Sequence, residues 1–334
     1  MNNLTNSNIP VLDSLRAFAA LSVCLFHFVC TTTGYIKTNW ILSTFSVGQY
    51  GVQLFFVISG FIIPWAMFRG GYKLKDFGRF LLKRLARLEP PYIFSIVLAL
   101  TLLFLREKFF GKTNDHMNVS VPQVALHLGY LIPFFDRYSW LNEVYWTLAI
   151  EFQYYLLIAV TFLPLIRSGP FVRYFIYALV IGLSILFPVK FIFYWLPVFL
   201  LGIILFLYKA QFILKTEYYI ATGILVIFCL FRYSVPSVIY SVIPLFCVLF
   251  AQDMKIVGLH YLGKFSYSLY LIHPLIGASF INVLSHRYTS PGGKIAVILG
   301  GIFVTILCSW LTYMLVERPS KKLSSSILYN KSQY

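Results

Sequence analysis

The feature that most constrains this chain of 334 residues is a series of apolar runs, each about 16 to 24 residues long. A helix of about 20 residues spans the hydrocarbon core of a bilayer, and only helices or closed barrels satisfy their backbone groups in lipid. We therefore predict an all-α integral membrane protein with about ten transmembrane helices. The ten runs lie near 10–31, 46–68, 89–105, 142–164, 171–188, 191–208, 217–232, 236–251, 262–284 and 294–316.

The composition excludes a soluble globular protein. Only 11% of the residues are charged, whereas a soluble domain carries about 25%. The 27 Lys and Arg residues outnumber the 11 Asp and Glu residues, but they are scattered over loops, so we expect no nucleic-acid partner. With both termini inside, 17 basic residues fall on the cytoplasmic face and 9 on the outer face. This excess predicts cytoplasmic termini.

Two segments differ from ordinary spans. The stretch 122–135 is apolar but short and contains two prolines and a histidine, so we expect a re-entrant or interfacial segment there. The first run has the length of a signal peptide, but Asp13 and Arg16 interrupt it, and we therefore keep it as the first transmembrane helix. The predicted divisions are a cytoplasmic tail at 1–9, a transmembrane domain at 10–319 and a cytoplasmic tail at 320–334.

The first span carries Asp13, Arg16 and His27. An ionisable group inside a membrane is costly, and such a group is a candidate site residue. Arg16 and His27 are eleven residues apart, which puts them within about 20° of one helical face and about 16 Å apart along its axis. Two interpretations stay open: a site along this face, or an Asp13–Arg16 pair with His27 reaching toward the membrane surface.

A second cluster contains Arg79, Lys83, Arg84 and Arg87 at helical spacing. Like charges three or four residues apart repel each other unless an anion lies between them, and the planar guanidinium group is suited to phosphate. The cluster predicts either a site for a phosphorylated ligand or an anchor on anionic lipid headgroups. Pro90–Pro91 follow, and we expect them to break the helix before the third span.

Further polar groups interrupt later spans. Glu151 lies inside the fourth span, where a carboxylate needs a partner such as Arg16 or a place in the site. His273 lies near the middle of the ninth span, where it is a rival to His27 as a base or a hydrogen-bonded packing residue. The five cysteines fall in apolar stretches without metal-ligand spacing, so we expect small buried side chains and no metal site.

Six short segments, in this order, resemble the acyltransferase-3 family of membrane acyltransferases. Gln53 stands where an acidic residue is common in the family, and Ser14 stands where glycine is common. Each segment alone is a weak signal, but their ordered combination covers nearly the whole chain. The segments are VLDSLRAFAA at 11–20 with its following His27, GVQLFFVISGF at 51–61, RLAR at 84–87, WTLAIEFQYY at 146–155, SYSLYLIH at 266–273 and VERP at 316–319.

The resemblance implies transfer of an acetyl group from cytoplasmic acetyl-CoA to a sugar hydroxyl of a surface polysaccharide. It most resembles O-antigen acetylases of bacteria and phages, which implies the bacterial inner membrane and a lipopolysaccharide acceptor, with rhamnose as one acceptor sugar. It also implies that His27 is the base, with Arg16 and Asp13 as further catalytic residues. The family's RxxR element implies that acetyl-CoA binds at Arg84 and Arg87 with Lys83 and Arg79. Candidate substrate-site residues are Glu151, Gln53, Ser59, Tyr270 and His273.

A second functional class is compatible with the same pattern. Ten helices with charges inside the membrane also suit a transporter or flippase for a polar or lipid-linked substrate. The two classes differ in one observable, because a transporter moves its substrate without cleaving a thioester. We expect a polysaccharide or lipid-linked sugar acceptor and membrane lipid as partners; the sequence identifies neither the acceptor position nor the oligomeric state.

Overall fold

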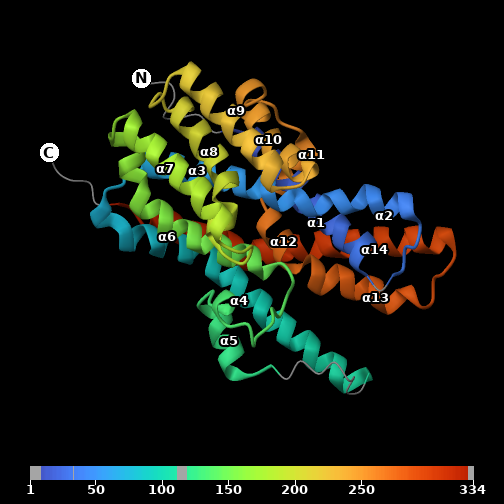
Figure 1. Ribbon diagram of the computed structural model, residues 1–334. Helices are drawn as coiled ribbons and strands as arrows, with labels where there is room; N and C mark the ends of the chain where they lie inside the picture. The colour runs from blue at the N-terminus through green and yellow to red at the C-terminus, as the bar shows by residue number, and fades with distance from the viewer. Residues whose placement is uncertain (1–8, 33, 111–118, 330–334) are drawn as a thin grey trace.

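A computed structural model describes residues 9–32, 34–110 and 119–329 of the chain (Figure 1). These residues form helices joined by turns, with no strand among them. The predicted tails at 1–9 and 320–334 therefore fall partly outside the described residues. The main helices are α1 (Val11–Phe26), α2 (Asn39–Ser46), α3 (Gly51–Arg69), α4 (Phe77–Phe110), α5 (Val121–Leu128), α6 (Tyr145–Arg167), α7 (Pro170–Leu186), α8 (Ile192–Lys209), α9 (Lys215–Arg232), α10 (Val235–Phe250), α11 (Val257–Gly263), α12 (Ser266–His273), α13 (Ser279–Ser285), α14 (Pro291–Thr312) and α15 (Arg318–Ser326).

The prediction of an all-α membrane protein is confirmed. Every one of the ten apolar runs coincides with a helix. Two more helices, α7 and α10, are apolar but shorter than 18 residues, and α9 carries Lys215, Glu217 and Arg232. Within the described residues, seven helical stretches are long and apolar enough to cross a membrane: Val11–Thr31, Asn39–Arg69, Leu74–Phe109, Tyr145–Arg167, Ile192–Lys209, Ser266–Ser285 and Pro291–Ser326.

The core of the bundle is the contact between α3 and α8, which lie side by side in Figure 1. A Cβ atom at Gly202 would meet the Val57 carbonyl oxygen at 2.1 Å, and one at Gly60 would meet the Phe199 carbonyl oxygen at 2.2 Å. The two backbones therefore touch, as small residues allow between membrane helices. Because α8 is buried along nearly its whole length, this helix pair forms a rigid wall behind the residues of α3.

The break expected at Pro90–Pro91 is wrong. Helix α4 runs without interruption from Phe77 to Phe110 through both prolines. Proline removes a backbone donor but its fixed φ is helical, and membrane helices tolerate it where neighbouring side chains take up backbone carbonyl groups. Here the Tyr267 hydroxyl of α12 donates to the Leu88 carbonyl oxygen at 3.0 Å. The RLAR segment and the third span therefore form one continuous helix.

Three π-helical turns interrupt the bundle, each next to a polar residue. The first, η1, spans His27–Thr31, the second, η5, spans Pro274–Ala278 directly after His273, and the third, η6, spans Tyr313–Glu317. Such turns are rare and are found mostly at functional sites. They therefore direct attention to His27, His273 and Glu317 independently of the sequence motifs.

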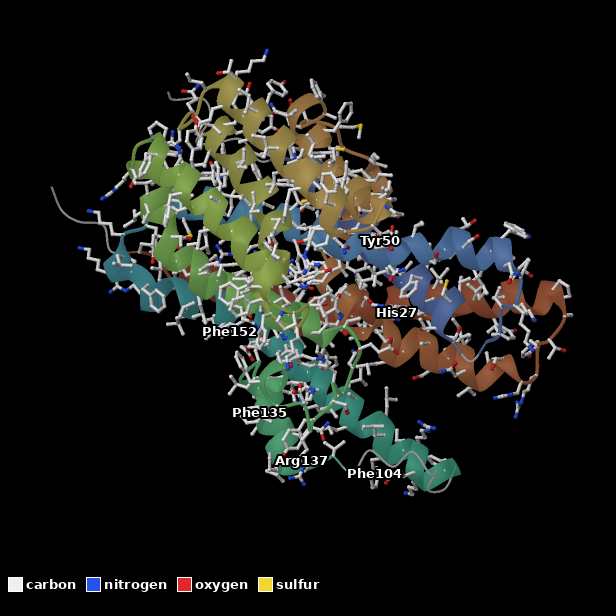
Figure 2. All side chains as sticks on the ribbon, viewed as in Figure 1. His27, Tyr50, Phe104, Phe135, Arg137 and Phe152 are labelled. Atoms are coloured by element: carbon white, nitrogen blue, oxygen red, sulfur yellow. The ribbon has the colours of Figure 1, made fainter. Side chains whose placement is uncertain are left out.

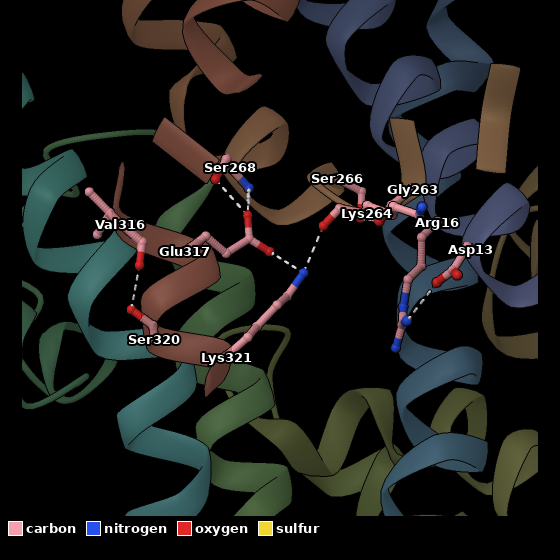
Figure 3. Close-up of polar contacts among 10 residues, drawn as sticks. All are labelled: Asp13, Arg16, Gly263, Lys264, Ser266, Ser268, Val316, Glu317, Ser320 and Lys321. Atoms are coloured by element: carbon pink, nitrogen blue, oxygen red, sulfur yellow. Dashed lines mark hydrogen bonds and ion pairs between the residues drawn. The ribbon is translucent and has the colours of Figure 1, made fainter. Parts of the chain in front are cut away.

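Glu317 joins the end of the chain to the start of α12 (Figure 3). Its carboxylate is 1% exposed and accepts hydrogen bonds from the backbone N–H and the hydroxyl of Ser268, at 3.1 and 2.6 Å. The Lys321 ammonium lies 2.7 Å from its other oxygen. An anion at a helix N-terminus satisfies free N–H groups and the helix dipole, so Glu317 fixes where α12 begins.

The segment 122–135 forms α5 and a short 3₁₀ turn, Ile132–Phe134, beside α4. His127 is fully buried there. Its Nδ1 lies 2.8 Å from the Gln123 carbonyl oxygen, and its Nε2 accepts from the Leu141 N–H at 3.0 Å. His127 is therefore a structural residue that ties α5 to the chain entering α6. A re-entrant or interfacial position for this segment stays a prediction.

Candidate active site

A cavity of about 320 Å³ lies inside the bundle. Its wall is formed by residues of α1, α3, α4, α6, α12 and the C-terminal segment. Most membrane-facing interiors are apolar, yet this wall contains five cations and three carboxylates. The charged lining residues are Asp13, Arg16, Arg84, Arg87, Glu151, Lys264, Glu317 and Lys321.

Two arginines of α4 give the cavity its cationic character. Arg84 is 5% exposed, and its Nε has no hydrogen-bond partner among the described residues. Its guanidinium group lies 5.3 Å from the Phe80 ring and 5.9 Å from the Tyr155 ring, which gives it cation–π contacts but no counter-ion. Arg87, one turn further, also lines the cavity. A buried guanidinium without an anion is costly, so this part of the cavity is suited to an anionic ligand.

Asp13 and Arg16 lie on the opposite wall, on the first turns of α1 (Figure 3). Arg16 Nη1 is 3.5 Å from Asp13 Oδ1, and Asp13 Oδ2 is 3.6 Å from Nδ1 of His260. Helix α11 reaches this close because it ends at Gly263, where a Cβ would meet the Asp13 carbonyl oxygen at 2.0 Å. The long Asp13–Arg16 contact leaves most of the guanidinium donors of Arg16 available to the cavity.

Hydroxyl groups line the part of the cavity between α3, α6 and α12. Glu151 accepts from the Ser59 hydroxyl at 3.1 Å and from the Tyr155 hydroxyl at 2.5 Å. The hydroxyl groups of Thr147 and Tyr270 are 2.9 Å apart. Within the described residues no ion pair joins Glu151 to Arg16, so the carboxylate is held by hydrogen bonds and belongs to the cavity wall.

Two histidines lie at the other end of α1 from Arg16. The ring centroids of His27 and His273 are 5.1 Å apart, and the His273 ring is 5.9 Å from the Tyr270 ring. Neither histidine lines the cavity, but Tyr270 lines it and contacts His273. Nδ1 of His27 is 3.3 Å from Oε2 of Glu143. Figure 2 shows His27 on α1 where α1, α13 and α14 run side by side.

Comparison with known proteins decides the family. A family model described as an acyltransferase domain matches residues 9–314, which is most of the chain. The chain belongs to the acyltransferase-3 family. The six segments identified in the sequence are thus correctly assigned, and the protein is a multi-pass membrane acyltransferase.

Curated relatives agree with the family. The O-acetyltransferase OatA of Staphylococcus aureus strain NCTC 8325 / PS 47 is 29% identical over 94% of this chain and 57% of its own length, and OatA of strain COL gives the same values. A further S. aureus protein, from strain MRSA252, is 27% identical over 98% of this chain and 59% of its own length. The chain thus spans a little over half the length of these relatives. No solved structure matches the chain.

The structure brings most of the sequence-predicted residues of this acyltransferase to one cavity. The residues lining it are Asp13, Arg16, Ser59, Arg84, Arg87, Glu151 and Tyr270. Gln53 is buried beside it, and its Oε1 has no partner among the described residues. Lys83 turns away to donate to the Ile327 carbonyl oxygen at 3.0 Å, and Arg79 is exposed. The catalytic and binding roles of all these residues stay predictions.

Several residues of the acyltransferase site were not singled out from the sequence. Lys264 and Lys321 extend the cationic wall, and the Lys321 ammonium also donates to the Lys264 carbonyl oxygen at 2.7 Å. Both were counted only among the topology-setting charges. Glu143 was recognised only as the first acidic residue of the fourth span; its spacing from His27 in sequence carries no signal, because the two meet only through the fold.

Proposed function

We propose that this chain transfers an acetyl group from acetyl-CoA to a hydroxyl group of a sugar in a cell-surface polysaccharide. The observation that carries the proposal is the cavity itself, which joins buried arginines without counter-ions to a line of hydroxyl groups next to a histidine pair. An anionic donor and a neutral hydroxyl acceptor each find suitable partners along this path. The family of the chain and the names of its relatives agree with this chemistry.

The proposed donor site is formed by Arg84 and Arg87. Guanidinium groups bind phosphate through paired N–H donors, and the phosphates of coenzyme A supply the anion that Arg84 lacks. The proposal includes the bacterial inner membrane with cytoplasmic termini, which puts this end of α4 on the side where acetyl-CoA is present. The excess of basic residues on that face supports the orientation.

The proposed base is His27. An imidazole that is neutral near pH 7 can take the proton of the sugar hydroxyl while its oxygen attacks the acetyl carbonyl. The new C–O bond replaces the C–S bond, and the coenzyme A sulfur leaves and takes up a proton. Arg16, oriented by Asp13, donates hydrogen bonds toward the negative charge that develops on the reacting groups.

The proposed acceptor is lipopolysaccharide O-antigen, with rhamnose as one acceptor sugar. Its support is the resemblance to compact O-antigen acetylases. The direct observation is NMR of the surface polysaccharide from cells with and without this gene, since an acetyl ester shifts the signals of the modified ring proton. An unchanged spectrum in cells that contain the protein in their membranes would remove this acceptor.

The activity is tested with membranes incubated with acetyl-labelled acetyl-CoA. We expect label in polysaccharide together with an equal amount of free coenzyme A. His27→Ala should abolish transfer, and the double variant Arg84→Ala with Arg87→Ala should raise the KM for acetyl-CoA. Arg69→Ala, which removes an exposed arginine at the end of α3, is the matched control. Label that crosses the membrane without release of coenzyme A would identify a transporter instead.

A further inference from the structure

Glu143 lies in the short loop before α6 and meets His27 at the end of α1. We propose that Glu143 is a positioning residue that holds His27 in the tautomer with its proton on Nδ1, leaving Nε2 free to accept the proton of the acceptor hydroxyl. This inference rests on the proposed function. A carboxylate that orients a histidine base is a general device of hydrolases and transferases, and here the contacts of one ring nitrogen argue for it.

Both groups that lie against Nδ1 of His27 are acceptors. Oε2 of Glu143 is 3.3 Å away, and Oγ1 of Thr31 is 3.4 Å away. The Thr31 hydroxyl already donates its proton to the His27 carbonyl oxygen at 3.0 Å, so only its lone pairs face the ring. An ionised carboxylate has no proton to give. Nδ1 therefore carries the proton, and in the neutral ring Nε2 is the basic atom.

Glu143 is ionised under ordinary conditions. The hydrogen bond from His27 lowers the pKa of the Glu143 carboxyl, and the charge on His27 when it is protonated acts in the same direction. The side chain is 66% exposed, whereas that of His27 is only 10% exposed. The carboxylate thus keeps water on one side and presents an oxygen to a buried ring on the other.

The loop that carries this exposed carboxylate is fixed on both sides of Glu143. The Leu141 N–H donates to Nε2 of the buried His127 at 3.0 Å. Asn142 is 4% exposed and donates to the Leu271 carbonyl oxygen of α12 at 2.9 Å. These buried contacts hold the backbone, so the Glu143 carboxylate is presented to His27 by the fold rather than by its own burial.

His273 cannot take over this role. Its Nδ1 faces the carbonyl oxygens of Tyr270 at 2.9 Å and Leu269 at 3.2 Å, so Nδ1 is the protonated atom there too. Its Nε2 is buried and without a partner among the described residues. Glu143 and His273 are the titratable groups that contact His27 in the described part of the chain, and of these only Glu143 carries a negative charge.

The size of the effect follows from the exposure of Glu143. Carboxylates that orient a histidine from outside the reacting groups typically contribute 10- to 100-fold, and the solvent around Glu143 argues for that range rather than for the larger effect of a buried carboxylate. A nearby carboxylate also favours the protonated imidazole. Removing it should therefore move the acidic limb of the pH–rate profile to lower pH, by about half a unit to one unit.

The kinetic test compares Glu143→Gln, Glu143→Asp and Glu107→Gln in nanodiscs. The last variant removes an exposed carboxylate near the end of α4 and serves as the matched control. For Glu143→Gln we expect kcat to fall about 10- to 100-fold, the KM for acetyl-CoA to stay unchanged, and the acidic limb to shift as described. Glu143→Asp should restore part of kcat. A wild-type kcat and profile in Glu143→Gln, or a change in KM alone, would overturn the assignment.

A second measurement does not depend on activity. In protein labelled with ¹⁵N-histidine, the chemical shifts of the two ring nitrogens report which one carries the proton, and His27→Gln assigns the signal. We expect the neutral His27 ring of the wild type to be protonated on Nδ1, and Glu143→Gln to show a mixture of tautomers. Protonation of His27 on Nε2 in the wild type would refute the inference. Failure of wild-type membranes to release coenzyme A would refute the proposed function alone.

Discussion

Replacing Glu317 tests whether a single buried carboxylate holds the start of α12 in place. Glu317→Ala removes two hydrogen bonds from Ser268 and the ion pair with Lys321. Hydrogen bonds to a charged group contribute about 1.5–3 kcal/mol each. The Lys321 side chain is 31% exposed, so its ion pair adds about 1 kcal/mol at most.

The sum is a loss of about 3 to 7 kcal/mol. We expect the lower half of this range, because Glu317 borders the cavity and water from the cavity can hydrate the Ser268 groups left behind. One kcal/mol corresponds to about 2–4 °C in Tm for chains longer than 150 residues. The Tm of Glu317→Ala should therefore fall by at least about 6 °C.

The assay is thermal unfolding of the detergent-solubilised protein, followed by intrinsic fluorescence. Glu317→Gln keeps an acceptor oxygen for Ser268 and should give an intermediate Tm. Ser320→Ala is the control, because it removes one neutral hydrogen bond to the Val316 carbonyl oxygen on the same helix and should cost about 1 kcal/mol or less. Equal Tm values for Glu317→Ala and Ser320→Ala would refute the reasoning.

Three further outcomes are expected. Gly202→Ala should lower the Tm strongly, because its Cβ would meet backbone at 2.1 Å, whereas Gly223→Ala, with open space around it, should raise it slightly; equal shifts would contradict the close contact of α3 and α8. Arg173→Met should cost about 3–5 kcal/mol by leaving Glu217 buried and alone, and the double variant with Glu217→Met should cost less; in urea titrations the reverse order would count against their 3.3 Å ion pair. Burial lowers the pKa of His127 below its ordinary value, so its stabilising contribution is present above about pH 6.5 and is lost as the pH falls. The Tm difference between wild type and His127→Gln should accordingly narrow from pH 7 to pH 5, and a constant difference would contradict this.

The fold was largely predictable because lipid leaves few options for an apolar chain. Each run long enough to cross a bilayer had to be helical, and the structure has a helix at each of the ten. The break at Pro90–Pro91 was predicted wrongly, because the local rule for proline ignores what a neighbouring helix can supply. The Tyr267 hydroxyl group that bonds to the Leu88 carbonyl oxygen lies 179 residues away in sequence, and no local pattern announces it.

The site was predictable only in part, for the same reason. Arg16, Arg84 and Glu151 stood out because charged residues are rare in lipid, and the structure brings them to one cavity. Glu143 and Lys321 did not stand out, because they lie where charge is ordinary. Their importance comes from their partners His27 and Glu317, which only the packing of distant helices reveals.

The cavity has two unlike walls. On one side, α3 touches α8 backbone to backbone, at Gly60 and Gly202, and any separation there exposes an apolar seam with no polar substitute for the lost contacts. On the other side, Lys321 bridges Glu317 and the Lys264 carbonyl oxygen, and water or an anion can replace each of these contacts in turn. The cavity therefore behaves like a box with a fixed back and a front fastened by an exchangeable clasp, and the clasp is itself made of the charge that an anionic guest would seek.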